Sequence, residues 1–394
     1  MTLTTFERLL TPVGQAALAA ALELRPTEAS YPASADRLAK AFPVDLSRAA
    51  LDTVLRREKA RPKFARAAEM YFSREALEMA SGEVVASHRA KRFAAFPTVA
   101  DLCCGIGGDA LALAAAGRRV VGVDTDALRL RMAAANLAVH GLAGRFVCAD
   151  VLTAELPPFD AAFADPGRRP GGKRTLSTDR YEPPVSALVS RFGPGFPLGV
   201  KVAPGVPRDE LPRFDAEAEF LAVQGELKEC VLWFGPLRTA GVRATVLPGG
   251  HSLTGVPGPA AVGPPGAFVY DTSPAVSRSG LVRVLAEALH ARQLDPDIAL
   301  LTADTPTPTP FATPYRVEEV LPFHVKRLTG WLRERGVGRV TVLKRGSTVD
   351  SDELTAKLKL RGDGHRELIL TRCGGKPAVV VAARNSVADD GASR

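Results

Sequence analysis

The spacing of apolar residues changes near residue 98, so the chain divides into stretches of different character. Up to about residue 93, apolar positions such as Leu51, Val54 and Phe64 recur at roughly helical spacing. Beyond residue 98, short apolar runs alternate with longer amphipathic segments. This alternation is typical of βαβ units. We therefore expect an N-terminal helical domain over residues 1–93, followed by a mostly parallel sheet.

The short apolar runs predict the strands of a doubly wound α/β domain over residues 94–254. They lie at 99–102, 119–123, 145–148, 159–164, 198–202, 219–223, 230–234 and 244–247. Helices are expected over 109–116 and 126–140, between the first of these strands.

The remainder of the chain has a different composition. Residues 255–266 are rich in proline and glycine, which predicts a semi-rigid linker. Residues 267–385 combine helical patterns with apolar strand patterns and predict a separate α+β domain. The polar residues 386–394 are expected to form a flexible tail.

Charge and cysteine content narrow the class of protein. The formal net charge is +8 and the sequence pI is about 9.4, which is compatible with a polyanionic partner. The five cysteines are irregularly spaced, which argues against a disulfide framework and a zinc site. Neither a secretory signal nor a run near the ~20 apolar residues of a membrane span is visible. We expect a cytoplasmic protein without metal or membrane attachment; its oligomeric state is left open.

A glycine-rich segment, Asp101-Leu-Cys-Cys-Gly-Ile-Gly-Gly-Asp109, lies between the first predicted strand and its helix. Glycines there let the backbone turn sharply and approach a ligand closely. Gly105, Gly107 and Ala110 also satisfy a loose dinucleotide-binding pattern. Asp101 argues against a pyrophosphate ligand, because its carboxylate would repel the dianion and would favour a cationic ligand instead. The alternative is an ordinary strand-to-helix turn.

Four successive predicted strands are each followed by or end in an aspartate. These are Asp101, Asp124, Asp150 and Asp165. Because ligands of such sheets bind at the carboxyl ends of the strands, the four acids predict a cleft at this edge. Asp124 is placed to accept hydrogen bonds from ribose hydroxyls. One such residue would be unremarkable, since aspartate is common in turns.

Two basic clusters could bind phosphate. Asp165-Pro-Gly-Arg-Arg169 is followed by Lys173, and a guanidinium in this loop could stack on a base or bind a phosphate. The other cluster lies between Arg56 and Arg66, with Phe64 inside it. For the first cluster the alternative is a Pro-Gly turn with solvated arginines. For the second cluster it is a solvated helix face. Lys201, Glu226 and Glu229 are further candidates for the border of the cleft.

Several of these segments resemble a known family. DLCCGIGGD, VVGVDTD and CAD resemble the first three motifs of class I S-adenosylmethionine (SAM)-dependent methyltransferases. The chain also resembles a bacterial group in which this domain precedes a THUMP-like domain, in the segments Tyr71–Glu78, ADPGRR, KVAPG, GELKECVLWFG and 353–362. The second resemblance covers most of the chain. It implies a seven-stranded methyltransferase sheet over 94–254 and a THUMP-like domain over 267–385, with SAM as cofactor.

The resemblance also implies roles for individual residues. Those expected to bind the cofactor are Asp101, Cys103, Gly105, Gly107, Asp124, Thr125, Asp150 and Val151. Asp165 and Pro166 are the expected catalytic residues, and Gly167, Arg168, Arg169 and Lys173 the expected substrate-binding residues. Many methyltransferases carry Asp/Asn-Pro-Pro-aromatic at this position, where it orients an exocyclic amine. Here Gly167 and Arg168 replace the second proline and the aromatic residue, which leaves the target atom open.

The resulting hypothesis is an RNA methyltransferase that modifies a base nitrogen, such as an exocyclic amine, in tRNA or rRNA. A SAM- and RNA-binding module without catalysis, and a small-molecule methyltransferase, are the alternatives. Methylation of a pyrimidine at C5 would need a nucleophilic cysteine. Cys230 is a weak candidate for that role, because it has no adjacent base in the sequence.

Overall fold

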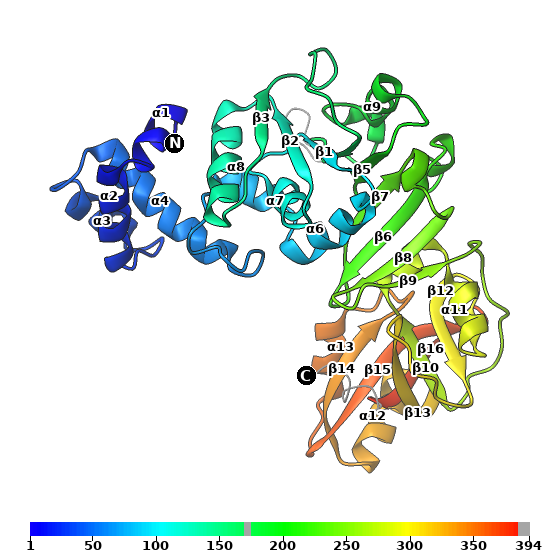
Figure 1. Cartoon of the computed structure of the whole chain (residues 1–394). Helices are drawn as coiled ribbons and strands as arrows, with labels where there is room; N and C mark the ends of the chain where they lie inside the picture. The colour runs from blue at the N-terminus through cyan, green and yellow to red at the C-terminus, as the bar shows by residue number, and fades with distance from the viewer. Residues whose placement is uncertain (169–174, 385–394) are drawn as a thin grey trace. The chain divides into compact units, whose positions relative to one another are not determined.

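The computed structural model describes residues 1–168 and 175–384 and divides the chain into two compact units (Figure 1). The first unit comprises Met1–Ala216 and Cys230–Thr239, and the second comprises Glu217–Glu229 and Ala240–Arg394. The domain boundaries expected at residues 93/94 and 254/255 therefore stay predictions. Within the described ranges, every helix is too short or too polar to cross a membrane.

The first unit begins with helices that pack on one another through their apolar faces. They are α1 (Leu3–Leu9), α2 (Pro12–Glu23), α3 (Tyr31–Leu38) and α4 (Val44–Ala60), drawn in blue in Figure 1. Thr11 caps α2 by accepting a hydrogen bond from the Gly14 N–H at 3.3 Å, with Pro12 in the first turn. Shorter helices follow: α5 (Arg74–Met79), α6 (Glu83–Ala90) and η1 (Lys91–Phe93).

The sheet of the first unit has the strand order β3-β2-β1-β4-β5-β7. Its members are β1 (Thr98–Leu102), β2 (Arg119–Asp124), β3 (Arg145–Cys148), β4 (Ala161–Ala164), β5 (Leu198–Val202) and β7 (Glu226–Trp233), of which β7 enters this unit at Cys230. All neighbours are parallel except β7, which runs antiparallel to β5. The helices between the strands are α7 (Gly108–Ala115), α8 (Ala127–Val139) and α9 (Val185–Phe192), with η3 (Thr178–Arg180) before α9.

The strand order determines where a ligand can bind. The chain moves outward from β1 to β2 and β3, then returns to place β4 on the other side of β1. The carboxyl ends of β1 and β4 therefore flank the point at which the direction of winding reverses, and ligands of open α/β sheets bind at such a point. Buried apolar residues fill both central strands, as expected for a parallel sheet covered on both faces.

The second unit contains two groups of strands. In the first group β6 (Glu217–Val223) pairs in parallel with β8 (Val242–Leu247), and β9 (His251–Thr254) is antiparallel to β8. The seventh strand expected for the methyltransferase sheet, β6, thus falls in this unit. The second group is a seven-stranded sheet in the order β11-β12-β10-β13-β16-β15-β14. Its neighbours are antiparallel apart from the parallel pair β14–β15.

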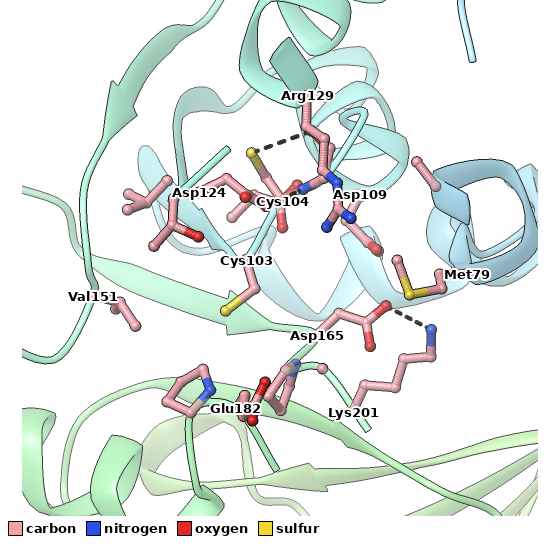
Figure 2. Close-up of a pocket in the computed structure, with 18 of the residues that line it drawn as sticks. Met79, Cys103, Cys104, Asp109, Asp124, Arg129, Val151, Asp165, Glu182 and Lys201 are labelled. Atoms are coloured by element: carbon pink, nitrogen blue, oxygen red, sulfur yellow. Dashed lines mark hydrogen bonds and ion pairs between the residues drawn. The ribbon is translucent and has the colours of Figure 1, made fainter. Parts of the chain in front are cut away.

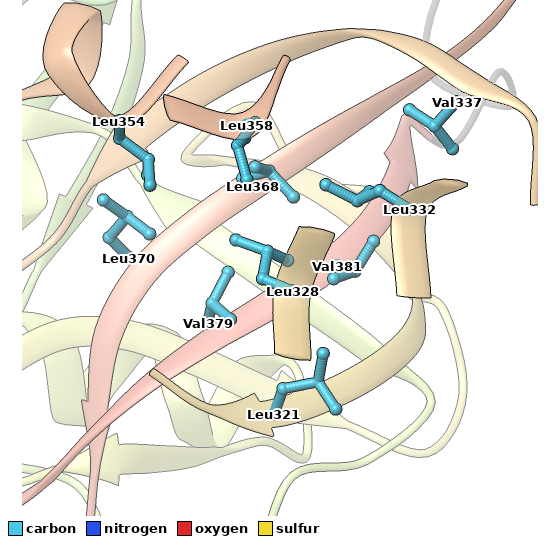
Figure 3. Close-up of a cluster of buried hydrophobic side chains, with 10 residues drawn as sticks. All are labelled: Leu321, Leu328, Leu332, Val337, Leu354, Leu358, Leu368, Leu370, Val379 and Val381. Atoms are coloured by element: carbon cyan, nitrogen blue, oxygen red, sulfur yellow. The ribbon is translucent and has the colours of Figure 1, made fainter. Parts of the chain in front are cut away.

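Helices cover this second sheet and bury its apolar side chains. The strands are β10 (Phe268–Thr272), β11 (Arg292–Asp295), β12 (Ile298–Ala303), β13 (Ala312–Pro322), β14 (Val337–Lys344), β15 (Gly364–Cys373) and β16 (Lys376–Arg384). The helices that pack on this sheet are α12 (Val325–Glu334) and α13 (Ser351–Leu358), whereas α10 (Pro274–Ser279) packs on β6 and β8, and α11 (Val282–Ala288) on β9. Leu328 and Leu332 of α12 meet Leu354 of α13 and Val379 of β16 in one buried cluster (Figure 3).

Residues 255–266, expected as a semi-rigid linker, lie within the second unit and are hydrogen-bonded to it. The Gly263 N–H donates to the Gln293 carbonyl at 3.0 Å, and the Gln293 N–H donates to the Ala261 carbonyl at 2.8 Å. The Gln293 side-chain oxygen accepts from the Ala260 N–H. The segment is therefore tied to β11 along part of its length, because its backbone groups find partners there.

Candidate active site

A cleft of about 610 Å³ lies at the carboxyl ends of β1, β2 and β4 in the first unit (Figure 2). The residues predicted from the sequence that line it are Asp101, Cys103, Gly105, Asp124, Thr125, Asp150, Val151, Asp165, Pro166, Gly167 and Arg168. Gly107 is not among the lining residues, and Arg169 and Lys173 lie outside the described residues. The structure thus brings the four aspartates that follow the strands to one cavity.

The loop after β1 is built from backbone conformations that favour glycine. Cys103, Gly105 and Gly107 have φ angles of 61°, 54° and 81°. A Cβ on Gly105 would meet no atom within 4 Å, so this backbone faces open space. A Cβ on Gly107 would lie 2.9 Å from the Cβ of Ala133 on α8. Gly105 therefore leaves room for a ligand, whereas Gly107 lets the loop pack closely against a helix.

Asp124, at the end of β2, fixes this loop from the neighbouring strand. One carboxylate oxygen accepts a hydrogen bond from the Gly105 N–H at 2.8 Å, and the other accepts from the Asp126 N–H at 2.9 Å. Each carboxylate oxygen has a further lone pair available to a ligand. Asp150 has a similar local anchor, because its carboxylate accepts from the Leu152 N–H at 2.8 Å. Both acids are thereby held in fixed orientations at the cleft.

Asp101 lies at the back of the cleft and is almost completely buried. Its carboxyl accepts a hydrogen bond from the Ala110 N–H at 2.7 Å, which ties β1 to α7. Burial, together with the neighbouring Asp109 carboxylate, raises the pKa of Asp101 well above its ordinary value. Asp109 itself is paired with the buried Arg89, whose terminal nitrogen lies 2.5 Å from the Asp109 carboxylate. A cationic ligand would stabilise the charged form of Asp101.

The cysteines of the site are poor nucleophiles. Burial, and next the Asp124 carboxylate, raise the pKa of Cys103, and burial also raises the pKa of Cys104. The reactive thiolate is therefore disfavoured at both positions. Cys230 is fully buried on β7 and does not line the cleft. The geometry gives no support to a cysteine nucleophile at these positions.

Asp165 and Lys201, which both line the cleft, form an ion pair (Figure 2). Asp165 follows β4, and its N–H donates to the Leu102 carbonyl of β1 at 3.2 Å. The Lys201 ammonium on β5 donates to one Asp165 carboxylate oxygen at 2.7 Å and to the Ser81 hydroxyl at 3.0 Å. Gly167 and Glu182 exchange two backbone hydrogen bonds of 2.9 Å, which shape the loop beyond Asp165.

A wall of the cleft was not predicted from the sequence. It consists of α5 and the residues after it, up to Ser81, and Met79 lies close to Asp165 and Lys201 in Figure 2. The Lys63 ammonium donates to the carbonyls of Leu77 at 2.7 Å, Glu78 at 3.3 Å and Ala80 at 2.9 Å. We call residues 73–82 the strap. The resemblance of Tyr71–Glu78 to the bacterial group was the one available signal, and it carried no role for these residues.

The basic cluster between Arg56 and Arg66 is engaged within the chain. Arg56 pairs with Asp52, Lys59 with Glu28, Arg61 with Glu58 and Arg66 with Glu69. Arg57 donates to the carbonyls of Met70 and Glu69, both at 2.9 Å. Phe64 is buried and therefore not available to stack on a base. These contacts favour the structural interpretation of this cluster over phosphate binding.

The cleft fits the cofactor that the motifs imply. Its volume lies within the ~300–1,000 Å³ typical of small-molecule sites. The open face of Gly105 admits a ligand, and Asp124 and Asp150 provide negative charge. Asp101 adds a carboxyl group whose charged form a cationic ligand would stabilise. The loops that follow β1, β2 and β3 contain no lysine or arginine. SAM carries a sulfonium and an ammonium group and no phosphate. Carboxylates at these positions suit it better than they would suit a dinucleotide.

Comparison with known proteins supports the same conclusion. Residues 99–165 match the family described as a methyltransferase domain, residues 312–384 match the family described as THUMP domain-like, and residues 2–60 match a domain of unknown function. An uncharacterized S-adenosylmethionine-dependent methyltransferase of Mycobacterium tuberculosis is 35% identical over 308 residues, which cover 77% of this chain and 85% of the relative. The same match is found in a second strain of that species.

The fold and the site define a SAM-dependent methyltransferase with a THUMP-like domain in its C-terminal part. The chain belongs to the family of S-adenosylmethionine-dependent methyltransferases that includes the two mycobacterial relatives. A crystal structure of a putative methyltransferase from Porphyromonas gingivalis W83 has the same fold. It superposes with a TM-score of 0.75 at 20% identity, over 94% of this chain and 98% of that chain.

Proposed function

We propose that this enzyme methylates RNA, at a base nitrogen such as an exocyclic amine. The observation that carries the proposal is the position of Asp165, which offers a carboxylate oxygen to the cleft beside the cofactor loop. In this proposal the first unit holds the cofactor and the reacting base in the cleft, with the strap as part of its wall, while the THUMP-like part contacts the rest of the RNA.

The cofactor roles follow from the position of each group in the cleft. Gly105 would lie against the cofactor, Asp124 would accept hydrogen bonds from its ribose hydroxyls, and Asp150 would accept from its adenine amine. When bound, SAM would supply an electrophilic methyl group to the acceptor nitrogen. The aspartates must therefore hold the cofactor without blocking the side on which Asp165 lies.

Asp165 is suited to orient an amine. One of its carboxylate oxygens accepts from Lys201, and the other, Oδ1, has no hydrogen-bond partner among residues 1–168 and 175–384. An exocyclic amine could donate an N–H to Oδ1, which would fix the direction of the nitrogen lone pair. Such positioning lowers the barrier to transfer without a covalent step. Arg168 lines the same cavity and could stack on the base.

RNA is favoured as the acceptor class by the charge of the THUMP-like segment. Residues 312–384 contain 15 Lys and Arg against 8 Asp and Glu, so the segment carries +7 of the net charge of +8. Its exposed cations that form no salt bridge with the described residues include Lys326, Arg327, Arg339, Lys344 and Lys359. A surface of this charge attracts a phosphate backbone. THUMP domains bind RNA, and the match of this segment extends that expectation to the chain.

The test is transfer of labelled methyl from SAM into macromolecules from a strain that lacks the gene, with RNA, DNA and protein fractions assayed in parallel. We expect label in RNA, and nucleoside analysis should place it on a base nitrogen. Asp165→Ala should reduce transfer by a factor of about 10² or more, since it removes the orienting acceptor. SAM affinity should stay within a few-fold of wild type.

Asp209→Ala is the matched control, because Asp209 is an exposed acid of the same unit that does not line the cleft. It should transfer methyl at the wild-type rate. Label in DNA, protein or small molecules but not in RNA would refute the proposed acceptor class. Full activity of Asp165→Ala would refute the role given to that residue.

A further inference from the structure

We propose that Lys201 is a positioning residue for methyl transfer: it holds the Asp165 carboxylate so that Oδ1 alone is presented to the acceptor. This inference rests on the proposed role of Asp165. It assigns a function to a lysine that the sequence placed only at the border of the cleft.

The sheet brings the two residues together. Asp165 directly follows β4 and Lys201 lies within β5, and these strands are parallel neighbours with Ala164 opposite Val200. The two side chains therefore leave adjacent strands at the same level, and the Lys201 ammonium lies 2.7 Å from Asp165 Oδ2. The Lys201 side chain is 9% exposed and that of Asp165 is 24% exposed. Both residues line the cleft, and the lysine is the more deeply buried of the two.

The hydrogen bond from Lys201 restricts the orientation of the Asp165 carboxylate. An ammonium group only donates hydrogen bonds, so it fixes whichever oxygen it contacts as an acceptor. With Oδ2 engaged by Lys201, a partial turn of the carboxylate plane about the Cβ–Cγ bond would break a strong charge-assisted hydrogen bond, and only a half-turn, which exchanges two equivalent oxygens, would restore it. Oδ1 is left to accept from the substrate. Without Lys201 the plane of the carboxylate could turn, and the oxygen that accepts from the substrate would be held less firmly.

A second contact explains how the lysine is itself held. Lys201 also donates to the Ser81 hydroxyl at 3.0 Å, and Ser81 lies in the strap. Lys63 secures the strap by donating to three of its carbonyl oxygens. The ammonium is therefore fixed between Asp165 on one side and the strap on the other. The strap, which precedes the cofactor-binding motifs in sequence, completes the site in this way.

An ion pair that merely stabilises the fold would look similar in a static structure, so the test needs a measurement that distinguishes the two roles. Chemical rescue does so. In Lys201→Ala the missing side chain leaves space in which a small alkylammonium ion could bind and donate to Asp165. Lys201→Met, which preserves the length of the side chain without its charge, provides a second variant should Lys201→Ala fold poorly.

We expect Lys201→Ala and Lys201→Met to lower kcat by a factor of about 10²–10³, because both lack the group that orients the carboxylate. SAM affinity, measured by calorimetry, should stay within a few-fold of wild type. Propylammonium should restore part of the kcat of Lys201→Ala in a saturable manner, while the isosteric but neutral propanol should not. Lys201→Arg should retain more activity than Lys201→Met. Lys91→Ala, which changes an exposed lysine of the same unit outside the cleft, should behave as wild type.

Two results would overturn the inference. One is an unchanged kcat in both Lys201→Ala and Lys201→Met. The other is a loss of activity that parallels a loss of thermal stability and SAM binding and that propylammonium does not reverse, as expected for a purely structural pair. All variants are assayed on the acceptor fraction that the wild-type enzyme labels. The identity of that fraction tests the proposed function, and the ratio of variant to wild-type kcat on it tests the role of Lys201.

Discussion

The side-chain amide of Asn136 pairs with the backbone of Tyr71 through both of its polar atoms. Its oxygen accepts from the Tyr71 N–H at 2.7 Å, and its nitrogen donates to the Tyr71 carbonyl at 3.0 Å. The same nitrogen donates to the Ile106 carbonyl in the loop that follows β1, also at 3.0 Å. Asn136 is completely buried on α8. One side chain thus joins the segment that precedes the strap to the loop that follows β1.

Asn136→Ala should therefore destabilise the protein and loosen the cofactor loop. It leaves the Tyr71 N–H and carbonyl and the Ile106 carbonyl without this partner in a buried environment, which costs about 1–3 kcal/mol for each group left unsatisfied. Because three groups lose their partner, we expect a loss of at least about 3 kcal/mol in the free energy of unfolding, and weaker SAM binding. Urea unfolding and calorimetry measure these effects. Arg131→Ala, at an exposed position of the same helix, should change neither, and a stable Asn136→Ala would contradict the expectation.

The buried pair of Arg89 and Asp109 should be energetically coupled. The Arg89 side chain is 1% exposed and also lies over the Phe163 ring, with 4.7 Å between the guanidinium carbon and the ring centroid. Arg89→Met leaves Asp109 as an unpaired buried charge next to Asp101, so we expect a loss of about 3–5 kcal/mol. The double variant Arg89→Met/Asp109→Leu should be more stable than the sum of the single effects indicates. A double-mutant cycle by urea unfolding measures this coupling, and strictly additive effects would rule it out.

The raised pKa of Asp101 predicts a pH-dependent stability. The pKa of Asp101 in the folded protein lies well above the ordinary value of 3.8, because of burial and of the Asp109 carboxylate. The folded protein then keeps this proton at pH values at which the unfolded chain has released it. The stabilising contribution is complete below the ordinary pKa and is lost as the pH rises through the raised folded pKa. Asp101→Asn is neutral at every pH and should not show this loss.

The free energy of unfolding of Asp101→Asn relative to wild type should therefore increase as the pH rises from about 4 toward the raised folded pKa. Urea unfolding of both proteins over a series of pH values measures the difference. Asp304→Asn is a suitable comparison, since the pKa of the exposed Asp304 is lowered by its hydrogen bond with Arg292 and its pH dependence has the opposite sign. A difference between Asp101→Asn and wild type that is independent of pH would contradict the shift.

The two basic regions should respond differently to neutralisation. Arg327, Arg339 and Lys344 are exposed in the THUMP-like segment, so replacing all three by Gln should weaken RNA binding. The slope of log affinity against log salt concentration should decrease by about 0.7–0.9 for each phosphate that the protein no longer neutralises. Lys59→Gln, which removes an exposed cation already paired with Glu28, should leave both affinity and slope unchanged. Filter binding at several salt concentrations measures this; equal effects of the two changes would argue against the assignment.

Sequence patterns predicted best those strands in which the apolar run and the turn residues at its two ends indicate the same limits. β3 and β5 have the predicted limits, because each is a short apolar run bounded by turn residues. In the second unit β13 (Ala312–Pro322) was not predicted. It contains Pro314 and the pair Glu318-Glu319, and its partners β10 and β16 lie far away in the sequence. Packing on both sides of this strand overrides its weak local pattern.

The residues of the candidate site likewise could be predicted only in part. The aspartates after the strands could be predicted, because the topology of a parallel sheet places strand ends together whatever the loops do. The contacts of Lys201 could not be predicted, because Lys201 lies 36 positions from Asp165 and 120 positions from Ser81 in the sequence. The periodic spacing of apolar residues does not indicate contacts between residues so far apart in the sequence. The role of the strap was missed for a similar reason. The strap is held in position by Lys63 and Arg129, which lie outside it in the sequence.

The strap also determines which fragment of the chain can serve as a self-sufficient enzyme. A truncation that begins at residue 94 would retain every motif by which the methyltransferase segment is recognised. It would nevertheless lack Met79 and Ser81 from the wall of the cleft, together with Lys63, which holds that wall in place. A fragment that preserves the whole wall of the cleft must therefore begin before Lys63.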